Sequence, residues 1–391
     1  MEKIVFTEEF CQPHNLFPFT LTRQIHDIRV GILTIREKWE QYLGLPSFDK
    51  QEGDYKDLDR AIVIDQNIDD DIIYLIHGNA LPTVRIAQKV KKLKPGEFLS
   101  LPEKENFAYC ISKKQVLSEH QIKMEKAVEL DEELHEIVFP WDICKQNFWA
   151  IKEDFSWLKK GKGAKLSSTN GVINPENVFV EKGAQLEYCF LNASDGPIYI
   201  GKNVVVMEGS MLRGPLAICE GAVVKMGAKI YGGTTIGPNC VVGGEIKNSV
   251  FFSNSNKAHD GYVGDSVIGE WCNMGAGTSN SNLKNNASSV FVYTPDGPVN
   301  VGIKCGVFMG DYSRTAINTT INTGTVIGVS CNVFGNGLTP KYIPSFSWGS
   351  DGVDRYQFDK ALTDIENWKN LKQLSITDSE RFILRHIFDH Y

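Results

Sequence analysis

The segment Gly244–Asn286 carries polar residues whose types and spacing could perform acid–base chemistry. It contains a single histidine, His259, flanked by charged residues. An imidazole can act as a general base near neutral pH. Glu245 lies fourteen residues earlier, and a carboxylate beside an imidazole fixes its tautomer and raises its basicity. A proton-abstracting His–Glu pair is one interpretation, and an inert surface histidine, the commoner case, is the other.

A second polar cluster, Asn280 to Asn286, lies at the end of the same segment. Asn and Ser are frequent in turns for purely conformational reasons. The cluster is therefore either part of a site or a plain solvated loop, and the residues leave both interpretations open.

The element that must position these residues is a six-residue repeat. Alternate side chains of a strand point to opposite faces, so six residues make a short strand and a corner, and three such hexads close one coil. The spacings of three and four expected of an α-helix are absent. The pattern predicts a β-helix rather than an antiparallel sandwich, the alternative. The aliphatic positions are Ile200, Val206, Leu212, Ile218, Val224, Ile230, Ile236 and Val242.

The repeat continues in two other phases on either side. Because a coil then holds about eighteen residues, Glu245 and His259 should lie on neighbouring coils. Between Val242 and Met309 the pattern is interrupted, and a break in a regular scaffold is where function is expected. The earlier phase holds Val172, Val178, Ala184 and Phe190, with a reset at Asn192–Pro197, and the later one holds Met309, Thr315, Ile321, Ile327 and Val333.

Residues outside the repeat predict two further domains. In residues 1–160, Ala61–Ile64, Ile72–Ile76 and Pro82–Lys92 read as strands or helices with a turn at Asp65–Asp71, which favours an α/β layer. Phe148–Lys165 reads as a helix-like linker into a β-helix domain at 165–338. In 339–391 a loop precedes helices expected at Asp354–Leu374 and Asp378–Phe388, where Thr377 and Glu380 form a capping box.

Bulk properties exclude several function classes. The 391-residue chain has a net charge of −7 and no clustered basic patch, which argues against nucleic-acid binding. No apolar run approaches the roughly 20 residues of a membrane span, and no signal peptide is evident, so we expect a cytoplasmic protein. The nine cysteines form no CxxC pair, so no metal site is expected.

The polar segment resembles the hexapeptide-repeat acyltransferases. More closely, it is similar to the acetyltransferase half of the bifunctional UDP-N-acetylglucosamine pyrophosphorylase / glucosamine-1-phosphate acetyltransferase family. The resemblance implies a left-handed parallel β-helix, acetyl-CoA as cofactor, an amino-sugar phosphate as substrate and a homotrimer with its site between subunits. The residues that carry it are Glu245, Lys247-Asn248, Lys257-Ala258-His259, Tyr262-Val263-Gly264-Asp265, Asn273-Met274-Gly275-Ala276-Gly277-Thr278 and Asn282.

The resemblance also implies a role for each matching residue. His259 would be the catalytic base that takes a proton from the amino group, and Glu245 its supporting carboxylate. The backbone at Ala276 would hold the oxyanion that develops on the thioester. Lys247, Tyr262, Asn273 and Asn282 would bind the sugar phosphate, and Gly310 and Gly328 would lie along coenzyme A.

Two positions depart from the family pattern. Tyr231 stands where the family has a phosphate-binding arginine, and Leu283 replaces an aromatic residue after Asn282. These departures leave the identity of the acceptor sugar open, and the same chemistry could act on a different sugar.

The N-terminal part resembles sugar nucleotidyltransferases of a divergent, shortened branch. The matching stretches are Phe17–Arg23, Asn79–Pro82 and Phe139–Asp142, while the Gly-rich loop that cradles a triphosphate is absent. An active nucleotidyltransferase, which would need Mg²⁺, and a vestigial sugar-nucleotide-binding module remain equally open.

Three functional hypotheses follow. The first is an enzyme, an acetyl-CoA-dependent N-acetyltransferase acting on an amino-sugar phosphate in nucleotide-sugar biosynthesis. The second is a sugar-1-phosphate nucleotidyltransferase that uses the β-helix to form trimers. The third is a non-catalytic scaffold that binds a sugar nucleotide.

Overall fold

The computed structural model describes residues 2–50, 60–62, 64, 72–101, 106–118, 121–159, 161, 163–352 and 354–391. Its backbone contacts group the chain into two compact units. Unit 1 comprises Met1–Leu16, Arg23–Ile28 and Leu33–Val138, and unit 2 comprises Phe17–Thr22, Arg29–Ile32 and Phe139–Tyr391. The domain limits at 160, 165 and 338 stay a prediction. The turn expected at Asp65–Asp71 lies outside the described residues.

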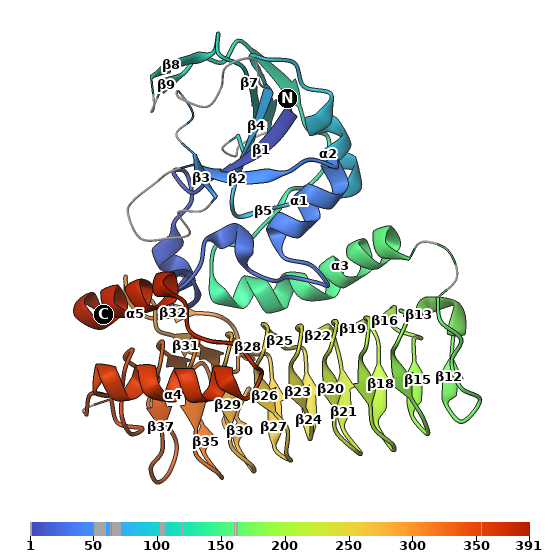
Figure 1. The fold of residues 1–391 in the computed structure, drawn as a ribbon, viewed down its shortest axis with the longest axis vertical. Coiled ribbons are helices and arrows are strands. Elements are labelled where there is room, and N and C mark those ends of the chain that lie inside the picture. Colours follow the sequence, from blue (N-terminus) through green and yellow to red (C-terminus); the bar gives the residue numbers. More distant parts are fainter. Residues whose placement is uncertain are drawn as a thin grey trace. The chain divides into compact units, whose positions relative to one another are not determined.

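Unit 1 is an α/β domain around one mixed sheet (Figure 1). Within this sheet β1 (Glu2–Thr7) pairs in parallel with β2 (Ser47–Lys50) and β4 (Ile72–His77), and β3 (Ala61–Ile62) extends the parallel part beyond β2. β7 (Ala108–Ile111) runs antiparallel between β4 and β6 (Glu97–Ser100), and β10 (Lys126–Glu129) forms the other edge. The helices are α1 (Ile35–Leu43) and α2 (Val84–Lys91). Two short pairs join β5 (Ala80–Leu81) to β11 (His135–Glu136) and β8 (Val116–Ser118) to β9 (Gln121–Ile122).

Unit 2 is a parallel β-helix. Its coils stack along one axis, and each coil adds one strand to each of three parallel sheets, which form the faces of the helix. The first sheet contains β12 (Gly171–Ile173), β15 (Phe190–Asn192), β18 (Met211–Arg213), β21 (Lys229–Tyr231), β24 (Glu245–Lys247) and β27 (Tyr262–Gly264), and the pair β30 (Ser279–Asn280) and β35 (Thr320–Ile321) follows β27. The second contains β13 (Val178–Val180), β16 (Ile198–Ile200), β19 (Leu216–Ile218), β22 (Thr234–Ile236), β25 (Val250–Phe251), β28 (Val267–Ile268), β33 (Phe308–Met309), β36 (Val326–Ile327) and β38 (Tyr342–Ile343). The third contains β14 (Gln185–Leu186), β17 (Val205–Val206), β20 (Val223–Val224), β23 (Val241–Val242), β26 (Asn256–Lys257), β29 (Asn273–Met274), β34 (Arg314–Thr315) and β37 (Asn332–Val333).

The six-residue repeat explains the core of unit 2. All eight aliphatic residues from Ile200 to Val242 point inward and are buried in one apolar cluster. The expected order of an α/β domain, a parallel β-helix and C-terminal helices is therefore confirmed. The inward position predicted for Phe190 in the earlier phase of the repeat is wrong. Its side chain is 59% exposed, because the neighbouring Leu191 takes the inward position of β15.

Helix α3 (Pro140–Leu158) lies along the second sheet, against β22, β25 and β28. The sequence placed this helix later, from Phe148, and read it as a linker. It begins at Pro140 because proline suits the first helical position, and the Asp142 carboxylate accepts the backbone N–H of Phe139. Asn147 on its buried face donates to the carbonyl of Gly233, so α3 is part of unit 2 rather than a connection.

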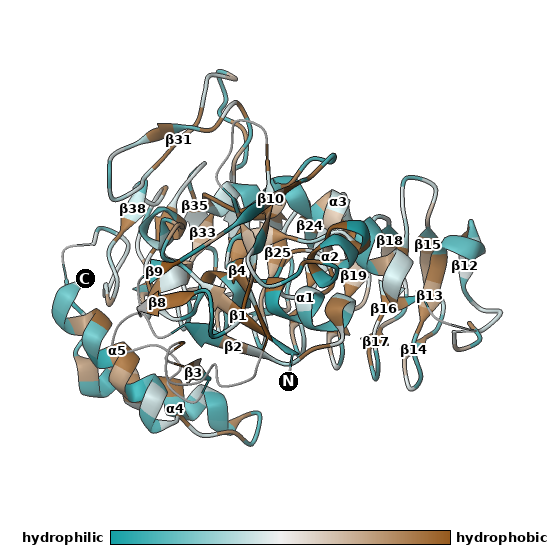
Figure 2. Cartoon of the chain, turned by 90° about the horizontal axis from the view of Figure 1, so that it is seen from above, coloured by the Kyte–Doolittle hydropathy of each residue, from teal (hydrophilic) through white to brown (hydrophobic). Residues whose placement is uncertain are grey.

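Two C-terminal helices lie on the flank of the β-helix, on the side opposite to the β31–β32 hairpin (Figure 2). They are α4 (Phe358–Asn370) and α5 (Asp378–His390), close to the predicted limits, and the capping box of Thr377 and Glu380 is confirmed. The guanidinium of Arg314, an outward residue of the third sheet, lies 5.5 Å from the Trp368 ring of α4. The second and third sheets thus both carry helices.

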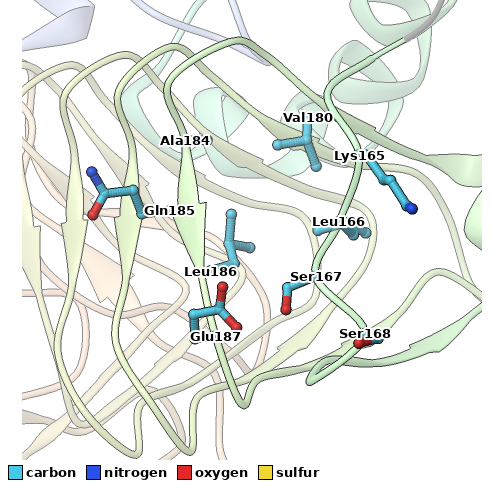
Figure 3. A pocket seen from close by; sticks show the side chains of 9 residues that line it. All are labelled: Lys165, Leu166, Ser167, Ser168, Val180, Ala184, Gln185, Leu186 and Glu187. Carbon is cyan, nitrogen blue, oxygen red and sulfur yellow. The ribbon is translucent and has the colours of Figure 1, made fainter.

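The N-terminal end of the β-helix is covered by the segment before β12. Leu166 of this segment packs against the core. A cavity of about 620 Å³ lies beneath it (Figure 3), lined by Lys165, Leu166, Ser167, Ser168, Val180, Ala184, Gln185, Leu186 and Glu187. None of the helices in the described part of the chain is long and apolar enough to cross a membrane.

Candidate active site

His259 lies on a turn that leads from the third sheet to the first, here named the third-to-first corner. In its own coil five residues lie between Lys257 and Val263, but one coil earlier only three residues lie between Val242 and Ile246. Because the corner after Val242 is short, it does not cover the longer corner of the next coil, and the His259 side chain is exposed. Gly244 makes this possible, because it has φ +72° and a Cβ there would lie 3.0 Å from the His259 carbonyl oxygen.

His259 and Glu245, the two residues expected to form a catalytic His–Glu pair, lie on adjacent coils, but their side chains are not hydrogen-bonded to each other. The Glu245 carboxylate accepts a hydrogen bond of 2.7 Å from the Tyr231 hydroxyl. Within the described residues the His259 imidazole has no hydrogen-bonding partner. The corner therefore presents a free imidazole, and Glu245 is held by a tyrosine instead.

Tyr231, Glu245 and Tyr262 form a polar cluster on the outer face of the first sheet. Glu245 is paired with Tyr262 in the strand register, and Tyr231 with Lys247. The hydrogen bond to Glu245, followed by burial, raises the pKa of Tyr231 to about 12. Burial, followed by the charges of Asp265 and Glu245, raises the pKa of Tyr262 to about 12. The Lys247 ammonium lies 5.8 Å from the Tyr231 ring, and Lys229, the register partner of Glu245, adds a second positive charge beside the cluster.

A network of amides and one carboxylate adjoins this cluster. The Asn282 side chain donates to Asp265 at 2.6 Å and to the Tyr262 hydroxyl at 3.0 Å, and Asn248 donates to Asp265 at 2.7 Å. The Tyr262 ring lies across Gly264, where a Cβ would be 2.2 Å from the hydroxyl oxygen. The network fixes the position of the Tyr262 ring on the sheet.

Asn280 was expected at the start of a possible solvated loop, and that interpretation is wrong at this residue. Its side chain occupies an inward position of the β-helix and is 3% exposed. The amide accepts from the Gly264 backbone N–H at 2.9 Å and donates to its carbonyl at 3.1 Å. The true insertion follows at 281–306 and carries the hairpin of β31 (Phe291–Val292) and β32 (Val299–Asn300), which projects from the β-helix (Figure 2).

Ala276 lies at the third-to-first corner of the next coil after His259. The Asp260 carbonyl accepts from the Gly277 N–H at 3.0 Å, which joins the two corners. In the described part of the chain no hydrogen bond uses the Ala276 N–H. The structure therefore brings a free backbone donor and a free imidazole to one edge of the first sheet.

Three predicted residues lie elsewhere in the chain. Asn273 is on the third sheet, next to Arg314, which α4 covers. Gly310 and Gly328 are buried at the corner between the second and third sheets, and their N–H groups bond to the carbonyls of Ile327 and Ile343. Within one chain these three are not brought to the cluster that holds Tyr262.

Sequence reasoning missed Tyr231 as the partner of Glu245, and it missed the inward orientation of Lys257 and Asn280. The strand register could have revealed Tyr231, because it lies one coil before Lys247.

Among the described residues no group of His, Cys, Asp and Glu is arranged to hold a metal ion.

A second candidate site lies in unit 1, at the carboxyl ends of β1 and β4. A cavity of about 260 Å³ is lined there by Phe10, Cys11, Gln12, Leu16, Ile25, Asn79, Glu136, Ile137 and Val138. Glu8 and Glu9 directly follow β1, and the Lys50 ammonium is paired with Glu9. Burial lowers the pKa of His77, at the end of β4, to about 4, so this imidazole is neutral at pH 7.

Known proteins resemble the two parts of the chain. Residues 4–163 match the family model described as sugar nucleotidyl transferase. The bifunctional protein GlmU of Methanocaldococcus jannaschii is 30% identical over 228 residues, which is 58% of this chain and 50% of that protein. A bifunctional sugar-1-phosphate nucleotidylyltransferase/acetyltransferase of Sulfurisphaera tokodaii is 41% identical over 91 residues, 23% of each chain.

A shorter protein is matched over most of its length. The uncharacterized acetyltransferase YaiX of Escherichia coli is 27% identical over 169 residues, 42% of this chain and 74% of that protein. Over the GlmU proteins, by contrast, the match spans about half of their length. The chain is thus similar over part of its length to bifunctional GlmU proteins, and its residues 4–163 match the sugar nucleotidyl transferase model.

Proposed function

We propose that this protein transfers an acetyl group from acetyl-CoA to the amino group of an amino-sugar phosphate. The observation that carries the proposal is the exposed third-to-first corner, where the free imidazole of His259 lies one coil from the free N–H of Ala276. The similarity to GlmU proteins and to an acetyltransferase supports the same reaction.

The reaction requires one proton acceptor and one oxyanion donor. The amine nitrogen attacks the thioester carbon while His259 takes the N–H proton, and the oxyanion that forms accepts a hydrogen bond from Ala276. The C–S bond then breaks, and the coenzyme A thiolate leaves and is protonated. Lys247, beside the Tyr231 ring, would bind the phosphate, and Tyr262 and Asn282 would bind sugar hydroxyls.

Glu245 acts in this proposal through the acceptor rather than through the imidazole. Its carboxylate is held by Tyr231 on the same face as Tyr262 and would attract an ammonium group of the amino sugar. Asn273, Gly310 and Gly328 would contribute only from a neighbouring subunit or along coenzyme A. A homotrimer would supply that neighbour, and the exposed Ile173, Phe190 and Met211 on the first sheet offer it an apolar surface.

The test is the release of coenzyme A from acetyl-CoA in the presence of glucosamine-1-phosphate and related amino-sugar phosphates. His259→Ala should lower kcat at least 100-fold, since general-base catalysis contributes about 10²–10⁴-fold. His390→Ala, a change of an exposed histidine in α5, is the matched control and should keep the wild-type rate. A full rate in His259→Ala would reject the assignment.

Nucleotidyl transfer by unit 1 is a second candidate, favoured by the family model that matches residues 4–163. The absence of the Gly-rich loop that cradles a triphosphate disfavours it. Pyrophosphate release from nucleoside triphosphates and sugar-1-phosphates with Mg²⁺ decides this question.

A scaffold without catalysis is distinguished by acetyl-CoA itself. A ligand of the native state raises the melting temperature, so acetyl-CoA in large excess should stabilise the protein if unit 2 binds it. No shift would favour the scaffold.

A further inference from the structure

A lysine occupies an inward position in the core of the β-helix. Lys257 is fully buried, and its strand partner on the preceding coil is Val242. Met274 takes the inward position on the next coil. At most other coils of the third sheet this position is apolar, as at Val206 and Val224. An ammonium group here is costly unless hydrogen bonds compensate it.

The compensation comes from the corner that carries His259. The Lys257 ammonium donates to the carbonyl oxygen of His259 and, at 3.1 Å, to that of Asp260. Two consecutive carbonyls therefore point inward at one cation. Because these carbonyls are turned toward the core, the exposed side chains of His259 and Asp260 lie on the outer side of the corner.

The same corner is held on its far side by backbone contacts. The Asp260 carbonyl also accepts from Gly277, and Gly261 has φ +127° with no room for a Cβ beside the Thr278 carbonyl. These contacts fix the end of the turn, and the Gly243 N–H, which donates to the Lys257 carbonyl at 2.7 Å, fixes its start. Among the described residues no backbone hydrogen bond holds the peptide unit between His259 and Asp260. In the described residues, the side-chain hydrogen bonds to the carbonyl of His259 come from Lys257.

We propose that Lys257 is a positioning residue, which fixes the corner 258–261 from inside the core so that the His259 imidazole faces the acceptor. This inference rests on the proposed function, in which His259 is the base. Burial lowers the pKa of Lys257 to about 8, as expected for an ammonium group enclosed by apolar residues.

The alternative is that Lys257 only fills space, and Lys257→Met separates the two roles. Methionine is apolar and similar in length, so it keeps the core filled but makes no hydrogen bond to the corner. We expect an unchanged or higher melting temperature, because a buried charge is removed. The kcat should fall 10- to 100-fold, with KM for acetyl-CoA within twofold of the wild type.

Met274→Leu is the matched control. It changes the adjacent inward residue of the third sheet without removing a hydrogen bond, and it should keep the wild-type kcat. If Lys257→Met lowers the melting temperature strongly and kcat no more than Met274→Leu does, Lys257 is a core residue only and the proposal is overturned.

Hydrogen exchange provides a readout that does not depend on acetyl transfer. In Lys257→Met the amides of 258–262 should exchange about tenfold faster, while those of β16 and β19 remain unchanged. Unchanged exchange at 258–262 overturns the proposal even if kcat falls. If the wild-type protein transfers no acetyl group, the proposed function fails, and local exchange still decides whether Lys257 fixes the corner.

A second variant keeps the test valid if Lys257→Met does not fold. Lys257→Gln retains an amide donor on a shorter, neutral side chain, so the amides of 258–262 should exchange several-fold faster than in the wild type. Wild-type exchange and kcat in Lys257→Gln, despite the lost charge and reach, would overturn the proposal.

Discussion

Gly264→Ala adds one methyl group beneath the Tyr262 ring. The new Cβ would lie 2.2 Å from the hydroxyl oxygen and 2.6 Å from the ring carbon that carries it. Ordinary contact begins at about 3.5 Å, so the end of the ring must move by more than about 1 Å. Gly264 does not have a positive φ, so alanine itself is not strained there.

The displacement should weaken acceptor binding without unfolding the protein. Moving the ring breaks the 3.0 Å hydrogen bond from Asn282, and a neutral hydrogen bond contributes about 1 kcal/mol. That is roughly a fivefold rise in KM for the acceptor, since 1.4 kcal/mol is tenfold. The expected kcat stays within twofold, because His259 is not moved.

Steady-state kinetics with a thiol reagent for released coenzyme A measures both constants. The double-mutant cycle with Tyr262→Ala tests the cause. In the Tyr262→Ala background, Gly264→Ala should have no further effect on KM, because there is no ring left to displace. An equal rise in KM in both backgrounds would refute the reasoning.

Three further predictions concern the polar groups around the two candidate sites. Tyr231→Phe removes the donor to Glu245 and should raise KM for the acceptor several-fold while leaving KM for acetyl-CoA unchanged, and an equal rise for both substrates would contradict the assignment. Asn280→Ala leaves the N–H and carbonyl of Gly264 without their side-chain partner. We expect the free energy of unfolding, measured by urea denaturation, to fall by about 2–4 kcal/mol. Asn285→Ala, in the exposed loop, is the control and should leave the free energy of unfolding almost unchanged. His77 is neutral in the folded state above about pH 4 but binds a proton below about pH 6.5 when unfolded, so the free energy of unfolding should fall by about 3 kcal/mol as pH decreases from 6.5 to 4. His77→Gln should flatten this dependence of the free energy of unfolding on pH, measured in a series of unfolding curves. An unchanged dependence would show that His77 is not its cause.

The sequence was sufficient to predict the β-helix because its core follows one rule. Most inward positions carry an apolar residue, and a coil of three short strands buries them together. The adjacency of Glu245 and His259 follows from the same rule, since it depends only on coil length. Hydrogen bonding between them could not be predicted, because it depends on how far each corner projects.

The parts that could not be predicted are those where a polar residue takes an apolar position. Lys257 and Asn280 point inward, yet by type they read as surface residues. Their burial is possible only because backbone groups of the neighbouring coil or corner bond to them. The placement of Asn273 beside a helix-covered residue likewise depends on where α4 packs, and the repeat carries no information on that.

The stacking of corners fixes the distance between residues on neighbouring coils of this site. Neighbouring strands are about 4.8 Å apart, whatever side chains they carry, so the step from the His259 corner to the Ala276 corner is set by the peptide backbone. Side chains on the outer face of the first sheet can then change without altering that step. Substitutions at positions such as Tyr231 would therefore change the surface offered to an acceptor while the His259 and Ala276 corners keep their separation, so the proposed chemistry would survive a change of substrate.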